Sequence, residues 1–145
     1  MKDSVWKTVA LAGGACMVAC AIVCLLMGGC ERLLVTTEGG TCHMSCYWCF
    51  RASAATGVLG GIAALVQAFM ADARSRRGTT LLVAAAAITT VLFNTTPLIG
   101  ICGDVSMVCH ETALVVDMLC AACLVLCAVA FAKPVPAAEK PKMGL

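Results

Sequence analysis

Two segments of the chain contain the residue types that could do chemistry, and each lies just ahead of a long apolar stretch. The first segment, 41–49, reads Thr-Cys-His-Met-Ser-Cys-Tyr-Trp-Cys, and the second, 101–110, reads Ile-Cys-Gly-Asp-Val-Ser-Met-Val-Cys-His. Cysteine, methionine and histidine are soft or borderline metal donors, and cysteine is also a redox group. The chemistry that these segments indicate is therefore disulfide formation, metal binding or thiol redox.

Disulfides are the first interpretation. The sequence places six cysteines in or beside the two segments: Cys30, Cys42, Cys46, Cys49, Cys102 and Cys109. Six cysteines allow 15 pairings, and spacing alone does not choose among them. The similarity of the two segments favours one bridge in each, Cys42–Cys46 and Cys102–Cys109, while a bridge between the segments stays open. Such bridges would act as structural staples.

Metal binding is the second interpretation. A mixed soft site suits copper(I) or zinc. The spacing matches no standard zinc module, in which Cys-x-x-Cys units usually occur twice, so the expectation is that no cofactor is required. The candidate ligands are His43, Met44, Met107, Cys109 and His110, with Cys46 beside them.

Thiol redox is the third interpretation. Cys46 and Cys49 form a Cys-x-x-Cys unit, a pair that exchanges readily when one thiol has a lowered pKa. Arg51 is close enough in sequence to favour a thiolate or a quinone oxygen. In topology alone, this arrangement resembles the bacterial disulfide-generating membrane oxidoreductases, which pass electrons to quinone. In a chain with 12 cysteines, however, a single Cys-x-x-Cys unit is expected fairly often by chance. The chain is therefore expected to be non-enzymatic, with a thiol–quinone oxidoreductase as the alternative.

Several polar and small residues lie inside the apolar stretches. Asp117 is i+7 from His110, so it is either part of a proton or cation relay or a hydrogen-bonded acid, because an intramembrane carboxylate is costly. Gln67 and Asn94 are expected to bond to neighbouring helices. Cys16, Cys20 and Cys24 repeat at four-residue intervals and form either a soft-metal or redox ladder or a stripe of small packing residues, and packing is expected. Gly57, Gly60 and Gly61 are expected to pack closely against another helix.

The elements that position these residues are membrane spans. Of the 145 residues, 61% are hydrophobic and only 12% are charged, too few charges to cover a soluble surface. Four blocks reach the length of about 20 apolar residues that a bilayer requires. They predict an all-α membrane protein of one domain, 1–145, with spans near 5–27, 53–71, 79–101 and 112–132 and a tail at 133–145. Nothing in the charge pattern indicates nucleic acid.

The distribution of Lys and Arg predicts the orientation. One side would carry Lys2, Lys7, Arg74, Arg76, Arg77, Lys133, Lys140 and Lys142, and the other only Arg32 and Arg51. Both termini and the tail are therefore expected in the cytoplasm of a multi-pass cell-membrane protein. Both cysteine-containing segments would face outward, which in a bacterium is an oxidising compartment.

The chain also shows a weak internal repeat. Aligning Cys46 with Cys109 pairs Met44 with Met107 and the second span with the fourth. The sequence then predicts two parallel helical hairpins, each helix–outer segment–helix, whose Met-x-Cys elements lie on the same side.

A family resemblance rests on Cys42-His43-Met44-Ser45-Cys46-Tyr47-Trp48 and on the second segment through Thr112. These motifs resemble those of an uncharacterised bacterial membrane family, domain of unknown function 4418. The resemblance implies a four-helix integral membrane protein without established activity, and an accessory subunit of a membrane transport system. Where the family would have Cys-His-Trp-Thr, this chain has Cys46-Tyr47-Trp48-Cys49. This departure weakens a metal site and creates the Cys-x-x-Cys unit.

The function expected from all of this is an accessory or binding subunit with a disulfide- or metal-bearing Cys/Met/His face outside the membrane. Its expected partners are the lipid bilayer and either a transport complex or further copies of the chain.

Overall fold

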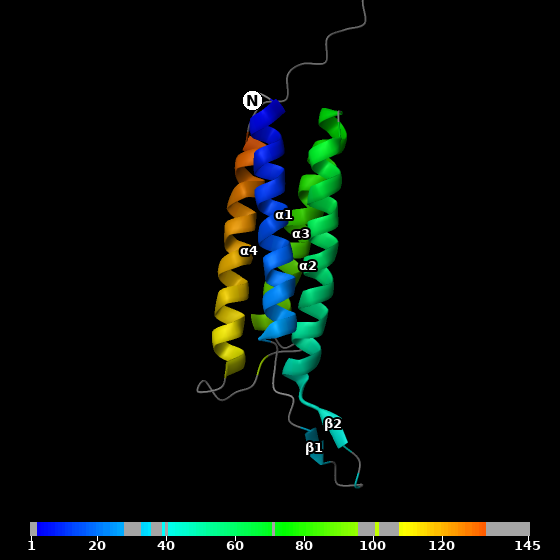
Figure 1. The fold of residues 1–145 in the computed structure, drawn as a ribbon, viewed down its shortest axis with the longest axis vertical. Helices are drawn as coiled ribbons and strands as arrows, with labels where there is room; N and C mark the ends of the chain where they lie inside the picture. The colour runs from blue at the N-terminus through cyan, green and yellow to red at the C-terminus, as the bar shows by residue number, and fades with distance from the viewer. Residues whose placement is uncertain are drawn as a thin grey trace, which may run out of the picture.

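The computed structural model describes residues 3–27, 33–35, 39, 41–70, 72–95, 101 and 108–132. Its helices are α1 (Asp3–Leu26), α2 (Ser45–Phe69), α3 (Ala73–Thr95) and α4 (Val108–Ala132), and all four lie roughly parallel to one long axis (Figure 1). Each helix is long and apolar enough to cross a membrane. The predicted all-α, four-span membrane protein is therefore confirmed.

The helices run alternately up and down the bundle (Figure 1). Helix α1 packs against α2 and α4, and α3 packs against the same two helices, while α1 and α3 have few contacts with each other. Two names serve below for the ends of the bundle. The arginine end is where α2 ends and α3 begins with Arg74, Arg76 and Arg77; the hairpin end is where α2 and α4 begin.

The bounds of the helices differ from those of the predicted spans. Helix α2 begins at Ser45 rather than near 53, and α4 begins at Val108 rather than near 112. Helix α3 runs from Ala73 to Thr95 instead of 79–101, and so ends ahead of Pro97. The spans were placed by apolar composition, whereas a helix continues through polar residues wherever its backbone hydrogen bonds are satisfied. As a result, both cysteines of the Cys-x-x-Cys unit belong to a helix and not to a loop.

A small antiparallel hairpin, which the sequence analysis did not predict, precedes α2. Strand β1 (Leu33–Val35) pairs with β2 (Thr41–His43) in the register Leu33↔His43, Leu34↔Cys42 and Val35↔Thr41. Gly39 lies between the strands with a φ of 79°, a conformation that glycine adopts without strain. The hairpin projects past the helix ends (Figure 1). Strands of three residues are too short to show a readable alternation of polar and apolar side chains.

Glycines bring α1 and α2 into close contact, as predicted. A Cβ atom on Gly57 would lie 2.9 Å from the carbonyl oxygen of Met17, and one on Gly61 would lie 2.7 Å from a methyl of Val18. Such close approach is the usual device of membrane helices, because lipid supplies no hydrophobic drive between them.

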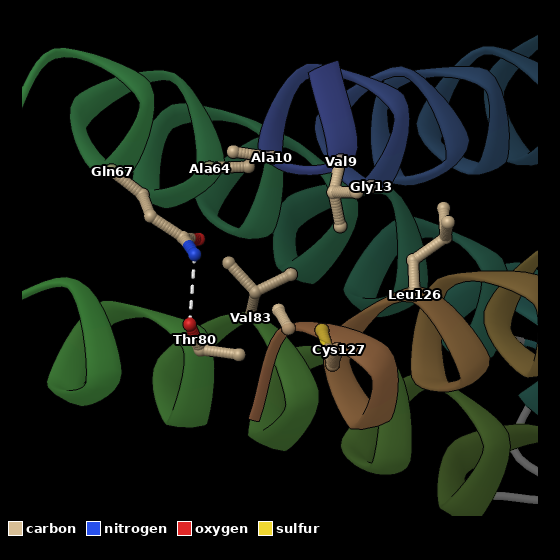
Figure 2. Close-up of a pocket in the computed structure, with 10 residues that line it drawn as sticks. Val9, Ala10, Gly13, Ala64, Gln67, Thr80, Val83, Leu126 and Cys127 are labelled. Carbon is tan, nitrogen blue, oxygen red and sulfur yellow. Dashed lines mark hydrogen bonds between the residues drawn. The ribbon is translucent and has the colours of Figure 1, made fainter. Parts of the chain in front are cut away.

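Hydrogen bonds connect α2 to α3. Gln67 Nε2 donates to Thr80 Oγ1 at 2.7 Å, beside a small cavity that α1 and α4 also line (Figure 2). The hydroxyls of Thr56 and Thr90 form a second bond of 2.7 Å. The prediction that Gln67 bonds to a neighbouring helix is thus confirmed.

Candidate functional site

The Cys-x-x-Cys unit lies in the first turns of α2, at the hairpin end. Cys46 and Cys49 are both completely buried, at 0% exposure, and the three-residue spacing puts them on one face of the helix. Arg51 is exposed, and its guanidinium carbon lies 5.2 Å from the centroid of the Tyr47 ring. The structure thus brings the two predicted redox cysteines together and sets Arg51 against an aromatic ring.

The Cys49 thiol is oriented toward α3. Its Sγ donates to the carbonyl oxygen of Phe93 at 3.1 Å, and Asn94 Oδ1 lies 3.5 Å from the same sulfur. A reactive thiol is ordinarily one that solvent and a co-substrate can reach. Cys49 is instead enclosed, with its hydrogen directed at the last turn of a neighbouring helix.

Asn94 extends this contact to α4. Its Nδ2 donates to Asp117 Oδ1 at 2.9 Å, and its side chain is only 2% exposed. A polar chain Cys49–Asn94–Asp117 therefore links α2, α3 and α4, and we refer to these three residues as the polar clasp. The expectation that Asn94 bonds between helices is confirmed, and Asp117 is a hydrogen-bonded acid; its role as a relay stays a prediction.

The pairing of Asn94 with Asp117 is not predictable from the sequence. Asn94 is the penultimate residue of α3, whereas Asp117 lies more than two turns into α4. Counting residues from the helix ends therefore gave no sign that the two side chains meet. The usable signal was the type of residue, because a polar group inside a span needs a partner on another helix.

The structure describes the side chains of three of the five predicted metal ligands. Met44 is the half-buried N-cap residue of α2, Cys109 is buried and His110 is half-buried in the first turn of α4. The side chain of His43, and Met107 entirely, lie outside the described residues. Among the residues that the structure describes, no group of three His, Cys, Asp or Glu side chains could hold a metal ion. The copper or zinc site stays a prediction.

The predicted disulfides have the same status. Cys102 and the side chain of Cys42 lie outside the described part of the chain, so neither Cys42–Cys46 nor Cys102–Cys109 is tested. Cys30 also lies outside it. The internal repeat and the orientation in the membrane likewise stay predictions.

The bundle and its enclosed polar clasp define a small multi-pass membrane protein that contacts lipid with its exposed apolar side chains. The family model described as a domain of unknown function, DUF4418, matches residues 10–132, so the chain belongs to this family. This confirms the resemblance seen in the paired cysteine motifs. No curated protein and no solved structure matches the chain.

Proposed function

We propose that this protein is a non-enzymatic membrane subunit that uses its hairpin and the neighbouring Cys/His/Met segment to bind a partner outside the membrane. The observation that carries the proposal is the position of the hairpin. Strands β1 and β2 project past the helix ends (Figure 1), and Val35 is 77% exposed. A projecting hairpin with an exposed valine adds little to the packing of the helix bundle, but it offers a surface that a partner protein can contact.

The two-stranded sheet offers a chemical means of binding. Its strand order is β1–β2, so within the sheet each strand has one partner only. An extended segment of a partner protein can add to such an edge through main-chain hydrogen bonds. The sequence of β2 also includes Cys42 and His43, residue types that can form a disulfide or bind a metal ion.

The buried thiols support a binding role over catalysis. Because Cys46 and Cys49 have no exposed surface, they are poorly placed to exchange electrons with a substrate. Because they lie at the start of α2, directly after β2, they belong to the helical turns to which the hairpin is attached. In this account the bundle is an anchor, and the polar clasp fixes the helix from which the hairpin projects.

A photocrosslinking amino acid at Val35 tests this proposal in native membranes. We expect a defined adduct with an extracytoplasmic or membrane protein, lost when the probe stays at position 35 and the other hairpin residues, 33–34 and 36–43, are replaced by glycine and serine. The matched control is the same probe at Leu114, which is 63% exposed on α4 and should react with lipid. Lipid adducts alone from both positions would refute a binding role for the hairpin.

The alternative is a thiol–quinone oxidoreductase that uses Cys46, Cys49 and Arg51. One observation favours it: the polar clasp connects the Cys49 thiol to a carboxylate through a single amide. The protein in lipid, supplied with a dithiol and a quinone, would then form quinol and a disulfide, and Cys49→Ser would abolish the reaction while Cys127→Ser would not. Absence of quinone reduction by the wild-type protein excludes this activity.

A further inference from the structure

A second set of cysteines lies in the middle of the bundle, away from the polar clasp. Helix α1 has three cysteines at four-residue intervals, which places them along one stripe of the helix. Helix α4, which packs against α1, contains three more within two turns. The six residues are Cys16, Cys20, Cys24, Cys120, Cys123 and Cys127.

The two stripes face each other. The sulfurs of Cys20 and Cys120 lie 3.9 Å apart, and both side chains have 0% exposure. One turn further toward the arginine end, Cys123 Sγ donates to the carbonyl oxygen of Gly13 at 3.7 Å. At this level of the bundle, the interface between α1 and α4 therefore includes a direct contact between two thiols, Cys20 and Cys120.

Sulfur is also unusually frequent in the core. Half of the buried residues in the hydrophobic cluster that the structure describes contain sulfur, with Met17 accompanying six cysteines. Alanine or valine would fill the same space without offering a donor to a ligand. The donors inside this bundle are thus soft ones, which select copper(I) over magnesium or calcium.

We propose that Cys20 and Cys120 form a binding site for a single copper(I) ion inside the membrane. With metal–sulfur bonds of about 2.3 Å, two sulfurs on one ion lie about 3.8 Å apart at a tetrahedral angle and about 4.6 Å apart in a straight line. A two-ligand copper(I) site is close to linear, so the observed 3.9 Å must widen by about 0.7 Å when the ion binds. A disulfide would require the sulfurs to close to about 2.05 Å, a far larger movement of two packed helices.

The number of available ligands selects the metal. Zinc in structural sites takes four ligands, and among the described residues no three His, Cys, Asp or Glu side chains converge. Copper(I), a soft monovalent ion, is satisfied by two sulfurs. The site belongs to this pair alone, and it is independent of the hairpin and of the function proposed for it.

Charge balance is compatible with the hydrocarbon interior. Copper(I) replaces one proton: Cu⁺ and two thiols give a complex of one thiolate and one thiol, and H⁺ leaves to the solvent. The complex is neutral, so it avoids the cost of about 2.5–3.5 kcal/mol that a charge incurs at the centre of a membrane helix. No electron is transferred, because the metal arrives already reduced.

Copper(I) competition with a coloured chelator tests the site. The full-length protein in detergent, reduced and free of oxygen, is titrated with copper(I) bound to bicinchoninate. Because the chain has 12 cysteines in all, the measured quantity is the difference in bound ions between wild type and variant. We expect Cys20→Ser and Cys120→Ser each to lose one ion per chain, and the double variant to lose the same one and no more.

The matched control is Cys127→Ser, on the same stripe of α4 and one turn beyond Cys123; it should keep the wild-type stoichiometry. Thermal unfolding of each variant identifies any that has lost its fold, and serine is close enough in size to cysteine to preserve the packing. Equal copper binding by wild type, Cys20→Ser and Cys120→Ser overturns the proposal. So does a Cys20–Cys120 disulfide in peptide maps of protein isolated without reductant, because the pair is then a covalent staple.

Discussion

Helices α1 and α3 occupy equivalent places in the bundle, yet they are held by different forces. Each packs against both α2 and α4. The described contacts of α1 are mainly steric: glycines on α2 accept its backbone, and its hydrogen bonds to α4 come from the weak thiol donors of the Cys20–Cys120 pair and of Cys123. Those of α3 are polar, with Thr80, Thr90 and Asn94 each bonded to another helix.

This difference shows that membrane helices can be held together in two ways, by close packing or by hydrogen bonds. Inside a bilayer, apolar surface gains nothing by leaving lipid for another helix, so association depends on close packing or on hydrogen bonds. Helix α1 is held by close packing, so an added methyl group at its interface should weaken its attachment. Helix α3 relies on specific polar atoms, and it should fail when one is removed.

The largest effect is expected at the steric interface, from Gly57→Ala. The added Cβ would lie 2.9 Å from the carbonyl oxygen of Met17 and 3.1 Å from the amide nitrogen of Ala21, both backbone atoms that cannot rotate away. Overpacking of this kind costs about 1–3 kcal/mol. Unfolding in mixed micelles with increasing sodium dodecyl sulfate measures the loss.

Two glycines give the matched controls for this variant. Gly60→Ala would meet the terminal methyl of Met17 at 2.7 Å, an atom on a flexible side chain that can move, so it should cost less. Gly78, in the first turns of α3, has no atom within 4 Å of an added Cβ, and Gly78→Ala should raise stability by up to about 1 kcal/mol. Equal losses from Gly57→Ala and Gly78→Ala would contradict the steric account of α1.

A smaller effect is expected at the polar interface, from Asn94→Leu. The variant removes the hydrogen bond to Asp117 and the acceptor beside Cys49. Hydrogen bonds between membrane helices contribute about 0.6 kcal/mol on average and at most about 1.7 kcal/mol, so the loss should lie in that interval. The same micelle unfolding assay measures it.

Thr95→Val is the adjacent control, because the Thr95 hydroxyl is exposed and bonds to Val91 O within α3. It should leave the stability nearly unchanged. If Asn94→Leu were equally harmless, the polar clasp would not hold α3 in place.

The sequence predicted the parts of this fold that follow from composition and from the type of single residues. Four apolar blocks predicted four spans, Gly57 predicted close packing, and Gln67 and Asn94 predicted bonds to other helices. Each of these inferences needs only the knowledge that hydrocarbon excludes unpaired polar groups and that small residues permit close approach.

The contacts between side chains of different helices could not be predicted, because a single sequence does not show which residues of two helices meet. Cys20 and Cys120 are separated by 100 positions, and their contact depends on the rotation of two helices about their axes. The same rotation decides that Asp117 is opposite Asn94. The predicted span begins near 53 and leaves Cys46 and Cys49 in the outer segment, while backbone hydrogen bonding makes both of them helical.

The smallest effect is expected outside the membrane, where α3 begins. Asp72 Oδ2 accepts from the backbone N–H of Ser75 at 3.0 Å and from its hydroxyl at 3.1 Å. These bonds hold the pKa of the Asp72 carboxyl below its usual range. Because the folded state prefers the carboxylate, the cap stabilises α3 above the ordinary carboxyl pKa of about 4 and is lost as the pH falls below it.

Asp72→Ala should therefore lower stability slightly at neutral pH and remove part of the decline of wild-type stability below about pH 4. Unfolding measured from pH 7 to pH 3 for both proteins checks this, with Asp72→Asn as the control that keeps an acceptor but does not titrate. An Asp72→Ala profile parallel to that of the wild type would mean that the cap contributes nothing. The polar attachment of α3 would then be confined to the residues that lie within the membrane.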